Sequence, residues 1–104
     1  MTPRVSNIEV SEAFSETCAH VGRRIRDRRT YEGLSQQKLA DMVGMSKSVL
    51  GDIERGCGNA SLRTLVKLAA GLNVTVADFF GNGAFHNYEY GTVDLRPGGS
   101  EPYQ

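Results

Sequence analysis

Small, glycine and aliphatic residues recur within residues 36–56 at spacings that would place a polar helix on the protein surface. The segment reads QQKLADMVGMSKSVLGDIERG, with Ala40 followed four residues later by Gly44 and six residues after that by Leu50. Two helices that cross at a wide angle through a tight turn require this pattern. The second helix then protrudes, so its polar outer side chains could hydrogen-bond to base edges in a DNA major groove about 12 Å wide.

Serine caps and apolar stripes predict the two helices of this segment. Ser35 and Ser46 can each accept a hydrogen bond from a backbone N–H of a first helical turn, which predicts helices over about 36–43 and 47–55. Met45 should pack beneath the turn between them. The inward faces are expected to carry Leu39, Ala40 and Val43 in the first helix, and Val49, Leu50 and Ile53 in the second.

A longer helix is predicted before this segment. Phe14, Cys18, Val21 and Ile25 recur every three or four residues, so a helix over 11–31 would bury one face, with Gly33 as its left-handed cap. Residues 1–10 are expected to form a flexible arm.

Two shorter helices are predicted after residue 60. Ser61 and Thr75 are their expected N-caps, Gly71 and Asn73 should end the first, and Phe79 or Phe80 should close the core from the second, over 76–80. The inward residues of the first are expected to be Leu62, Leu65, Val66, Leu68 and Ala69. The sequence therefore predicts an all-α helix-turn-helix domain of five helices over residues 11–80.

Residues 81–104 are expected to form a tail. Glycines punctuate it, and its apolar residues alternate in a way typical of strands, which predicts a short hairpin or one added strand, with disorder after Pro97. We expect the apolar set to contribute to a homodimer; it comprises Phe85, Tyr88, Tyr90, Val93 and Leu95. Ile8 and Phe14 offer a second route to dimerisation.

Charge and composition narrow the class of function. The net charge is zero, but residues 20–56 hold eight basic and five acidic side chains, so the positive excess lies on the segment expected to face DNA. No membrane segment and no catalytic constellation is expected, so we predict a cytoplasmic protein that is not an enzyme.

The sulfur and imidazole side chains do not suggest a metal site. Cys18, Cys57, His20 and His86 are each isolated in the sequence, so no metal, cofactor or disulfide framework is expected. Cys18 should act as a small buried hydrophobic residue, whereas Cys57, between glycines, is the better candidate for a redox-sensitive thiol.

Two segments, GLSQQKLADMVGMSKSVLGDIERG and NASLRTLVKLAAGLNVTVADFF, resemble the lambda-repressor-like (XRE/Cro) family of helix-turn-helix regulators over about residues 21–80. The resemblance implies a transcriptional regulator, most often a repressor, that binds a palindromic operator in double-stranded DNA as a homodimer.

The resemblance also implies residue roles. The base-facing positions of the recognition helix are Lys47, Ser48, Gly51 and Asp52. Phosphate contacts are expected from Gln36, at the start of the preceding helix, and from Ser46 and Gln37. Arg29 and Glu54 are expected to form a structural ion pair between the first helix and the recognition helix.

Two departures from the family pattern leave the target sequence open. Gly51 stands where a polar residue is usual, and Asp52 could accept from a cytosine amine, face solvent, or pair locally with Arg55. The loop Cys57-Gly58-Asn59-Ala60 lacks the family's common basic residue or proline, so it should make fewer phosphate contacts. An alternative function is an antitoxin or complex subunit whose tail binds a protein partner.

Overall fold

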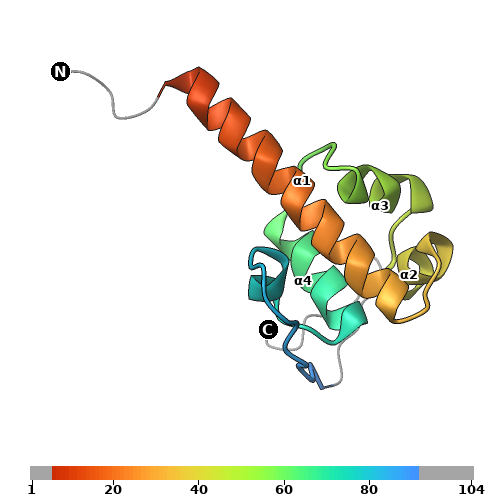
Figure 1. Cartoon of the computed structure of the whole chain (residues 1–104). Helices are drawn as coiled ribbons and strands as arrows, with labels where there is room; N and C mark the ends of the chain where they lie inside the picture. The colour runs from red at the N-terminus through yellow and green to blue at the C-terminus, as the bar shows by residue number, and fades with distance from the viewer. Residues whose placement is uncertain (1–5, 92–104) are drawn as a thin grey trace.

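A computed structural model of the chain describes residues 6–91, which fold into four α-helices and one 3₁₀-helix. These are α1 (Asn7–Tyr31), α2 (Gln36–Val43), α3 (Lys47–Glu54), α4 (Leu62–Leu72) and η1 (Val76–Phe79). In Figure 1, α1 runs diagonally across the body, with α2 and α3 on one side of it and η1 on the other. The all-α helix-turn-helix prediction is confirmed, although the predicted fifth helix is a single 3₁₀ turn.

Every element begins at a hydroxyl cap. The side-chain oxygens of Ser35, Ser46, Ser61 and Thr75 each accept the backbone N–H three residues on, as predicted. α2 ends at Gly44, whose left-handed conformation (φ 71°) turns the chain into α3.

The predicted end of α4 was partly wrong. The helix continues through Gly71, and Asn73 (φ 55°) is its left-handed cap. Gly71 serves packing instead, because a Cβ there would lie 2.6 Å from the Val43 Cγ1 of α2. A glycine at this position therefore lets α2 and α4 approach closely.

The core lies where α1, α2, α3, α4 and η1 meet. Its fully buried side chains include Ile25, Leu39, Leu50, Leu68 and Phe79. Of the two phenylalanines that could have closed the core, Phe79 does so and Phe80 is exposed.

Three residues predicted to face inward are exposed: Val49, Leu62 and Val66. Val49 and Val66 lie one residue before Leu50 and one after Leu65, and a single residue rotates the side chain by about 100° around a helix. Leu62 belongs to the first turn of α4, beyond the reach of the neighbouring helices. The buried face of these short helices is narrower than the run of aliphatic residues suggested.

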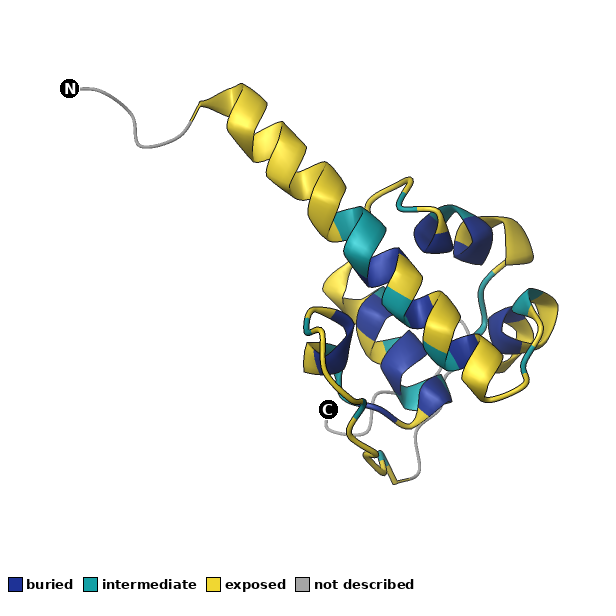
Figure 2. Ribbon diagram, in the orientation of Figure 1, coloured by how far each residue is buried: buried dark blue, intermediate teal, exposed yellow. Residues whose placement is uncertain are grey.

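The first helix begins earlier than predicted. A capping box between Ser6 and Glu9 starts α1 at Asn7, so residues 7–10 are helical where a flexible arm was expected. The N-terminal part of α1 projects beyond the body and is exposed along its length (Figure 2). Phe14, predicted to be buried, is exposed, because it lies at an open groove that no element within residues 6–91 fills.

The described part of the tail packs on its own domain. A single antiparallel bridge, between Val74 and Asn87, replaces the predicted hairpin or added strand within residues 81–91. Phe85 and Tyr90 are half-buried against the core, and the Arg24 guanidinium lies 4.0 Å from the centroid of the Phe85 ring. Tyr88 is exposed, while Val93, Leu95 and the segment after Pro97 lie outside the described residues.

Asp78 anchors this tail. Its buried carboxylate accepts hydrogen bonds from the backbone N–H groups of Thr75 (3.2 Å) and His86 (2.8 Å) and lies 2.6 Å from His86 Nδ1. Burial raises the pKa of Asp78, but the hydrogen bonds from His86 and Thr75 outweigh burial and hold the pKa well below its ordinary value.

We therefore expect Asp78→Asn to lower the free energy of unfolding by about 1–3 kcal/mol at pH 7. A depressed pKa stabilises the fold above the unfolded-state pKa of about 3.9, and this contribution is lost as the pH falls further. The difference between wild type and variant in chemical denaturation should therefore shrink from pH 7 to pH 3. Glu12→Gln, on the exposed part of α1, is the control, and a pH-independent Asp78→Asn difference would contradict the assignment.

Candidate nucleic-acid interface

The turn between α2 and α3 presents the first turn of α3 to solvent. Ala40 is fully buried where the helices cross, and the backbone N–H of Met45 donates to the carbonyl of Ala40 across the turn. Lys47 and Ser48 follow the cap Ser46, and all three are exposed. The predicted arrangement of a protruding second helix is therefore present.

A buried ion pair holds α3 against α1. Arg29 Nε and Nη2 donate to Glu54 Oε2 and Oε1 at 2.6 and 2.9 Å, and both side chains are buried. Arg29 Nη1 also donates to the carbonyl of Leu34 (2.8 Å), just before α2. The hydrogen bond to Glu54 raises the pKa of Arg29 more than burial lowers it, so the guanidinium stays protonated. The fork expected from the family resemblance is thus observed.

Gln36 joins the same network. Its Nε2 donates to Glu54 Oε1 at 2.9 Å, which ties the first residue of α2 to the last residue of α3. The amide group has two N–H donors, so one remains for another acceptor. The residue expected to brace a phosphate therefore also fixes the angle between α2 and α3.

Gly22 is a residue that the sequence analysis missed. A Cβ at this position of α1 would lie 2.4 Å from the carbonyl oxygen of Ile53 and 2.7 Å from that of Glu54. The glycine therefore lets the C-terminal end of α3 lie directly on α1. A signal was available, because glycine inside a helix costs about 1 kcal/mol relative to alanine and so suggests a packing reason.

Gly51 does not face outward as the resemblance implied. It is buried, and a Cβ there would lie 3.2 Å from Arg55 Nη1 and 3.8 Å from Gln36 Oε1. Because Gly51 has no side chain, the Arg55 guanidinium can lie across α3 at this position. The role of Gly51 is therefore to leave this space, and not to hydrogen-bond to a base.

The remaining predicted contact residues have local partners. Asp52 forms an ion pair with Arg55, with half or more of each side chain exposed, which is the local pairing considered as one of its alternatives. Gln37 Nε2 donates to Asp41 Oδ1 (2.8 Å) on the exposed face of α2, and Ser46 Oγ accepts from the backbone N–H of Val49. Neither Gln37 nor Ser46 is buried.

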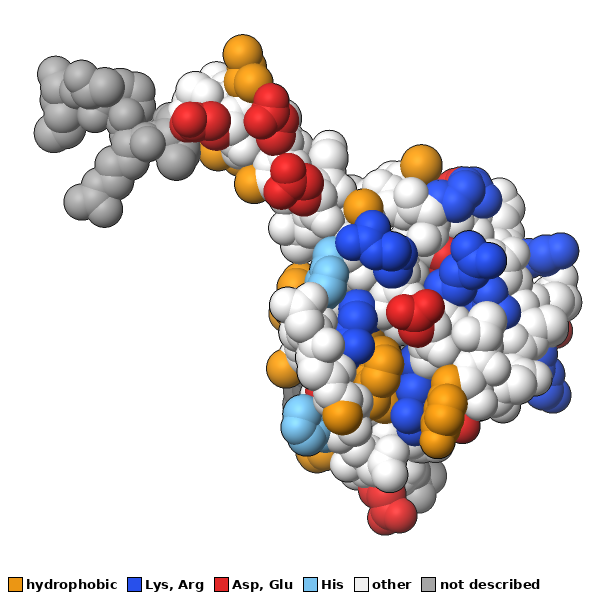
Figure 3. Space-filling view, in the orientation of Figure 1, with side chains coloured by type: hydrophobic (Ala, Val, Ile, Leu, Met, Phe, Trp, Pro, Cys, Tyr) orange, Lys and Arg blue, Asp and Glu red, His pale blue; other side chains and the backbone are white. Residues whose placement is uncertain are grey.

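Charge is unevenly distributed over the surface. Lys and Arg side chains spread over the body of the domain, whereas Glu9, Glu12 and Glu16 occupy the projecting part of α1 (Figure 3). An anionic ligand would therefore be attracted to the body and repelled by the projecting part. Within residues 6–91, no helix combines the length and hydropathy needed to span a membrane, and no cluster of metal-binding side chains occurs.

The family comparison agrees with this geometry. The family model described as helix-turn-helix, HTH_3, matches residues 25–79, which include α2, α3 and the Arg29–Glu54 pair. The chain belongs to this family.

Individual relatives include regulators and repressors. The chain is 40% identical over 55 residues to the HTH-type transcriptional regulator SutR of Escherichia coli, covering 53% of this chain and 31% of SutR. It is 41% identical over 61 residues to the immunity repressor protein of Bacillus phage phi105, covering 59% and 42% of the two chains. The first curated relatives it matches are covered over only 31–44% of their length.

Solved structures show the same fold. The restriction-modification controller protein C.AhdI from Aeromonas hydrophila aligns with a TM-score of 0.59 at 40% identity, covering 61% of this chain and 96% of that one. SinR, described as the master regulator for biofilm formation and solved in complex with DNA, aligns with a TM-score of 0.56 at 37% identity, covering 59% and 98%.

We expect Glu54→Ala to lower the free energy of unfolding by about 3–5 kcal/mol, because it leaves the buried Arg29 guanidinium without its counter-charge. Asp52→Ala removes a carboxylate from an exposed ion pair on the same helix and should change it by less than about 1 kcal/mol. Urea denaturation of both variants measures the difference. Equal small effects would mean that Glu54 behaves as a surface residue.

The close approach at Gly22 generates a second stability prediction. Gly22→Ala should destabilise the protein by about 1–3 kcal/mol despite alanine's higher helix propensity, since the new methyl group overlaps the carbonyl of Ile53. Gly83→Ala is the matched control, because a Cβ there meets nothing within 4 Å. A neutral or stabilising Gly22→Ala in thermal denaturation would refute the close contact.

Proposed function

We propose that this chain is a transcriptional regulator that binds double-stranded DNA by placing the first turn of α3 in the major groove. The observation that carries the proposal is the exposed turn Ser46-Lys47-Ser48, held on the outside of the domain by the buried network of Arg29, Glu54 and Gln36. A helix must be fixed in this way for its end to present hydrogen-bonding groups at a defined depth in the groove.

The roles of the contact residues follow from their surroundings. Lys47 and Ser48 would contact base edges or phosphates, while Gln37 and the spare N–H of Gln36 would contact phosphates beside the N-terminus of α2. Asp52 would approach the DNA with its charge partly neutralised by Arg55, and its carboxylate suits a cytosine amine. Gly51 would leave room for the Arg55 guanidinium beside the DNA and make no hydrogen bond through a side chain.

A dimer acting on a palindromic operator would raise the affinity. One domain offers few contacts to DNA, and its Cys57–Ala60 loop has no basic side chain. In a dimer, binding of one copy would hold the second copy at a high effective concentration near a half-site one helical turn away. Repression is the sign of regulation we propose, since an immunity repressor is among the relatives. The alternative of a tail devoted to a protein partner has less support, because Phe85 and Tyr90 already pack on their own domain.

Selection of bound sequences from a random duplex pool would identify the operator and test DNA binding itself. Against that operator, Lys47→Ala should weaken binding by about 1–3 kcal/mol while the melting temperature stays unchanged, because the side chain is exposed. Lys67→Ala, which removes the same charge from α4, is the control. If Lys47→Ala binds as tightly as wild type in a gel-shift or anisotropy titration, α3 is not the reading helix.

A further inference from the structure

The apolar stripe of α1 continues past the body of the domain, where no element within residues 6–91 covers its side chains. Val21 and Ile25 are buried in the core, and Cys18, Phe14 and Val10 extend the same helix face outward at intervals of three or four residues. Val10 and Phe14 are 53% and 49% exposed. An isolated helical extension is only marginally stable in water, so an uncovered stripe of this kind suggests a missing partner.

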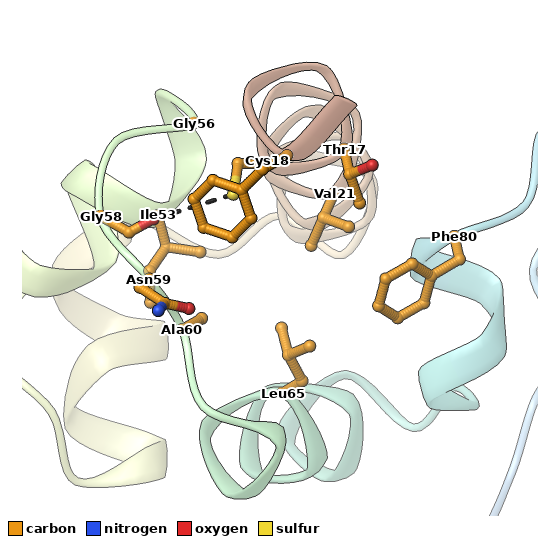
Figure 4. A pocket seen from close by; sticks show the side chains of 11 residues that line it. Thr17, Cys18, Val21, Ile53, Gly56, Gly58, Asn59, Ala60, Leu65 and Phe80 are labelled. Atoms are coloured by element: carbon orange, nitrogen blue, oxygen red, sulfur yellow. Dashed lines mark hydrogen bonds between the residues drawn. The ribbon is translucent and has the colours of Figure 1, made fainter. Parts of the chain in front are cut away.

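An uncharged groove lies at the base of this stripe. It is formed between α1, the end of α3 and the loop after it, α4 and the end of η1. Its lining includes Cys18, Val21, Ile53, Ala60, Leu65 and Phe80, and Phe14 of the stripe also lines it. Figure 4 shows these side chains arranged around a central space, with Val21 of α1, Leu65 of α4 and Phe80 at the end of η1 pointing toward it. No residue that lines the groove carries a charge, so it suits an apolar ridge.

We propose that the stripe of α1 docks in this groove of a second copy of the chain. The stripe and the groove lie next to each other on one molecule. A two-fold arrangement with the two α1 helices antiparallel would therefore place each stripe in the other copy's groove. This inference rests on the proposed function in one respect: it names the surface through which the dimer proposed above would form.

The available area fits a dimer. Two more exposed apolar residues, Leu62 and Val66, share a face of α4 with the groove residue Leu65, and Phe80 is 50% exposed at its edge. With Val10 and Phe14, these side chains leave on the order of 500 Å² of apolar surface uncovered per copy, more than isolated monomers usually expose in one patch. With its polar rim, the patch approaches the roughly 800 Å² per partner of a stable interface.

The charges of α1 favour this occupant over a lipid surface. By helical spacing, Glu9, Glu12 and Glu16 lie on the face opposite the stripe, so they stay in water when the stripe is covered. Helices that lie on membranes carry basic residues on their polar face, and three carboxylates would be repelled by anionic lipids. The acidic face would also keep the projecting half away from DNA phosphates.

The groove also connects the interface to the recognition helix. Ile53, in the last turn of α3, lines the groove beside Val21. A stripe docked there would contact the end of α3 directly and fix the two recognition helices relative to each other. Dimer formation and engagement of two half-sites would then depend on the same contacts.

The test measures mass in solution without DNA, by sedimentation equilibrium of the full chain. Wild type should dimerise, and the double variant Val10→Ser/Phe14→Ser should weaken the dimer by at least about tenfold. Phe80→Ser should do the same from the groove side while leaving α1 unaltered. Ile8→Ser is the matched control, because Ile8 is 71% exposed on the same projecting half but lies off the stripe, and it should leave the dimer unchanged.

Three results would overturn the inference: a monomeric wild type, a double variant or Phe80→Ser that dimerises as tightly as wild type, or an equal loss in Ile8→Ser. On DNA, the double variant should retain wild-type affinity for a single half-site and lose affinity for the paired site. Absence of DNA binding by every form would defeat the proposed function alone, since the mass measurement decides the interface independently.

Discussion

The ion pair between Arg29 and Glu54 is the interaction on which the rest of the domain depends. It joins the C-terminal part of α1 to the end of α3, and through Gln36 and the carbonyl of Leu34 it also fixes the start of α2. Buried charges are tolerated only where each hydrogen-bonding group is matched, and here the carboxylate accepts three donors. The network therefore favours one orientation of α3 over others that would bury the same apolar area.

Glycine and small residues make that orientation sterically possible. Gly22 brings α1 against the last turn of α3, and Gly71 brings α4 against α2. Both contacts involve atoms that a methyl group would displace, so the helix-turn-helix is held by close backbone approach as well as by the ion pair. The exposed first turn of α3 is the consequence, because the helix is held near its C-terminal end and its N-terminal end is left free to meet a ligand.

The same helix that anchors α3 also leaves the domain. N-terminal to Cys18, every described residue of α1 is exposed, although the amphipathic pattern of the helix continues there. The tail behaves in the opposite way. Its aromatic residues could have contacted another molecule, but Phe85 packs on its own domain, where Asp78 and Arg24 hold the segment around it. Segments outside the family pattern thus differ in role, one packing on the domain and the other projecting from it.

Local signals were sufficient to predict the helices and their order. Hydroxyl caps, a glycine turn and the spacing of Ala40, Gly44 and Leu50 act within a few residues, so their effect can be read without knowledge of the rest of the chain. The ion pair came from the family resemblance. Tertiary structure alone decided that Val49, Leu62 and Phe14 are exposed, that Gly51 is covered by Arg55, and that Phe79 enters the core. Periodicity predicts which residues share a face, but only packing determines whether another element covers it.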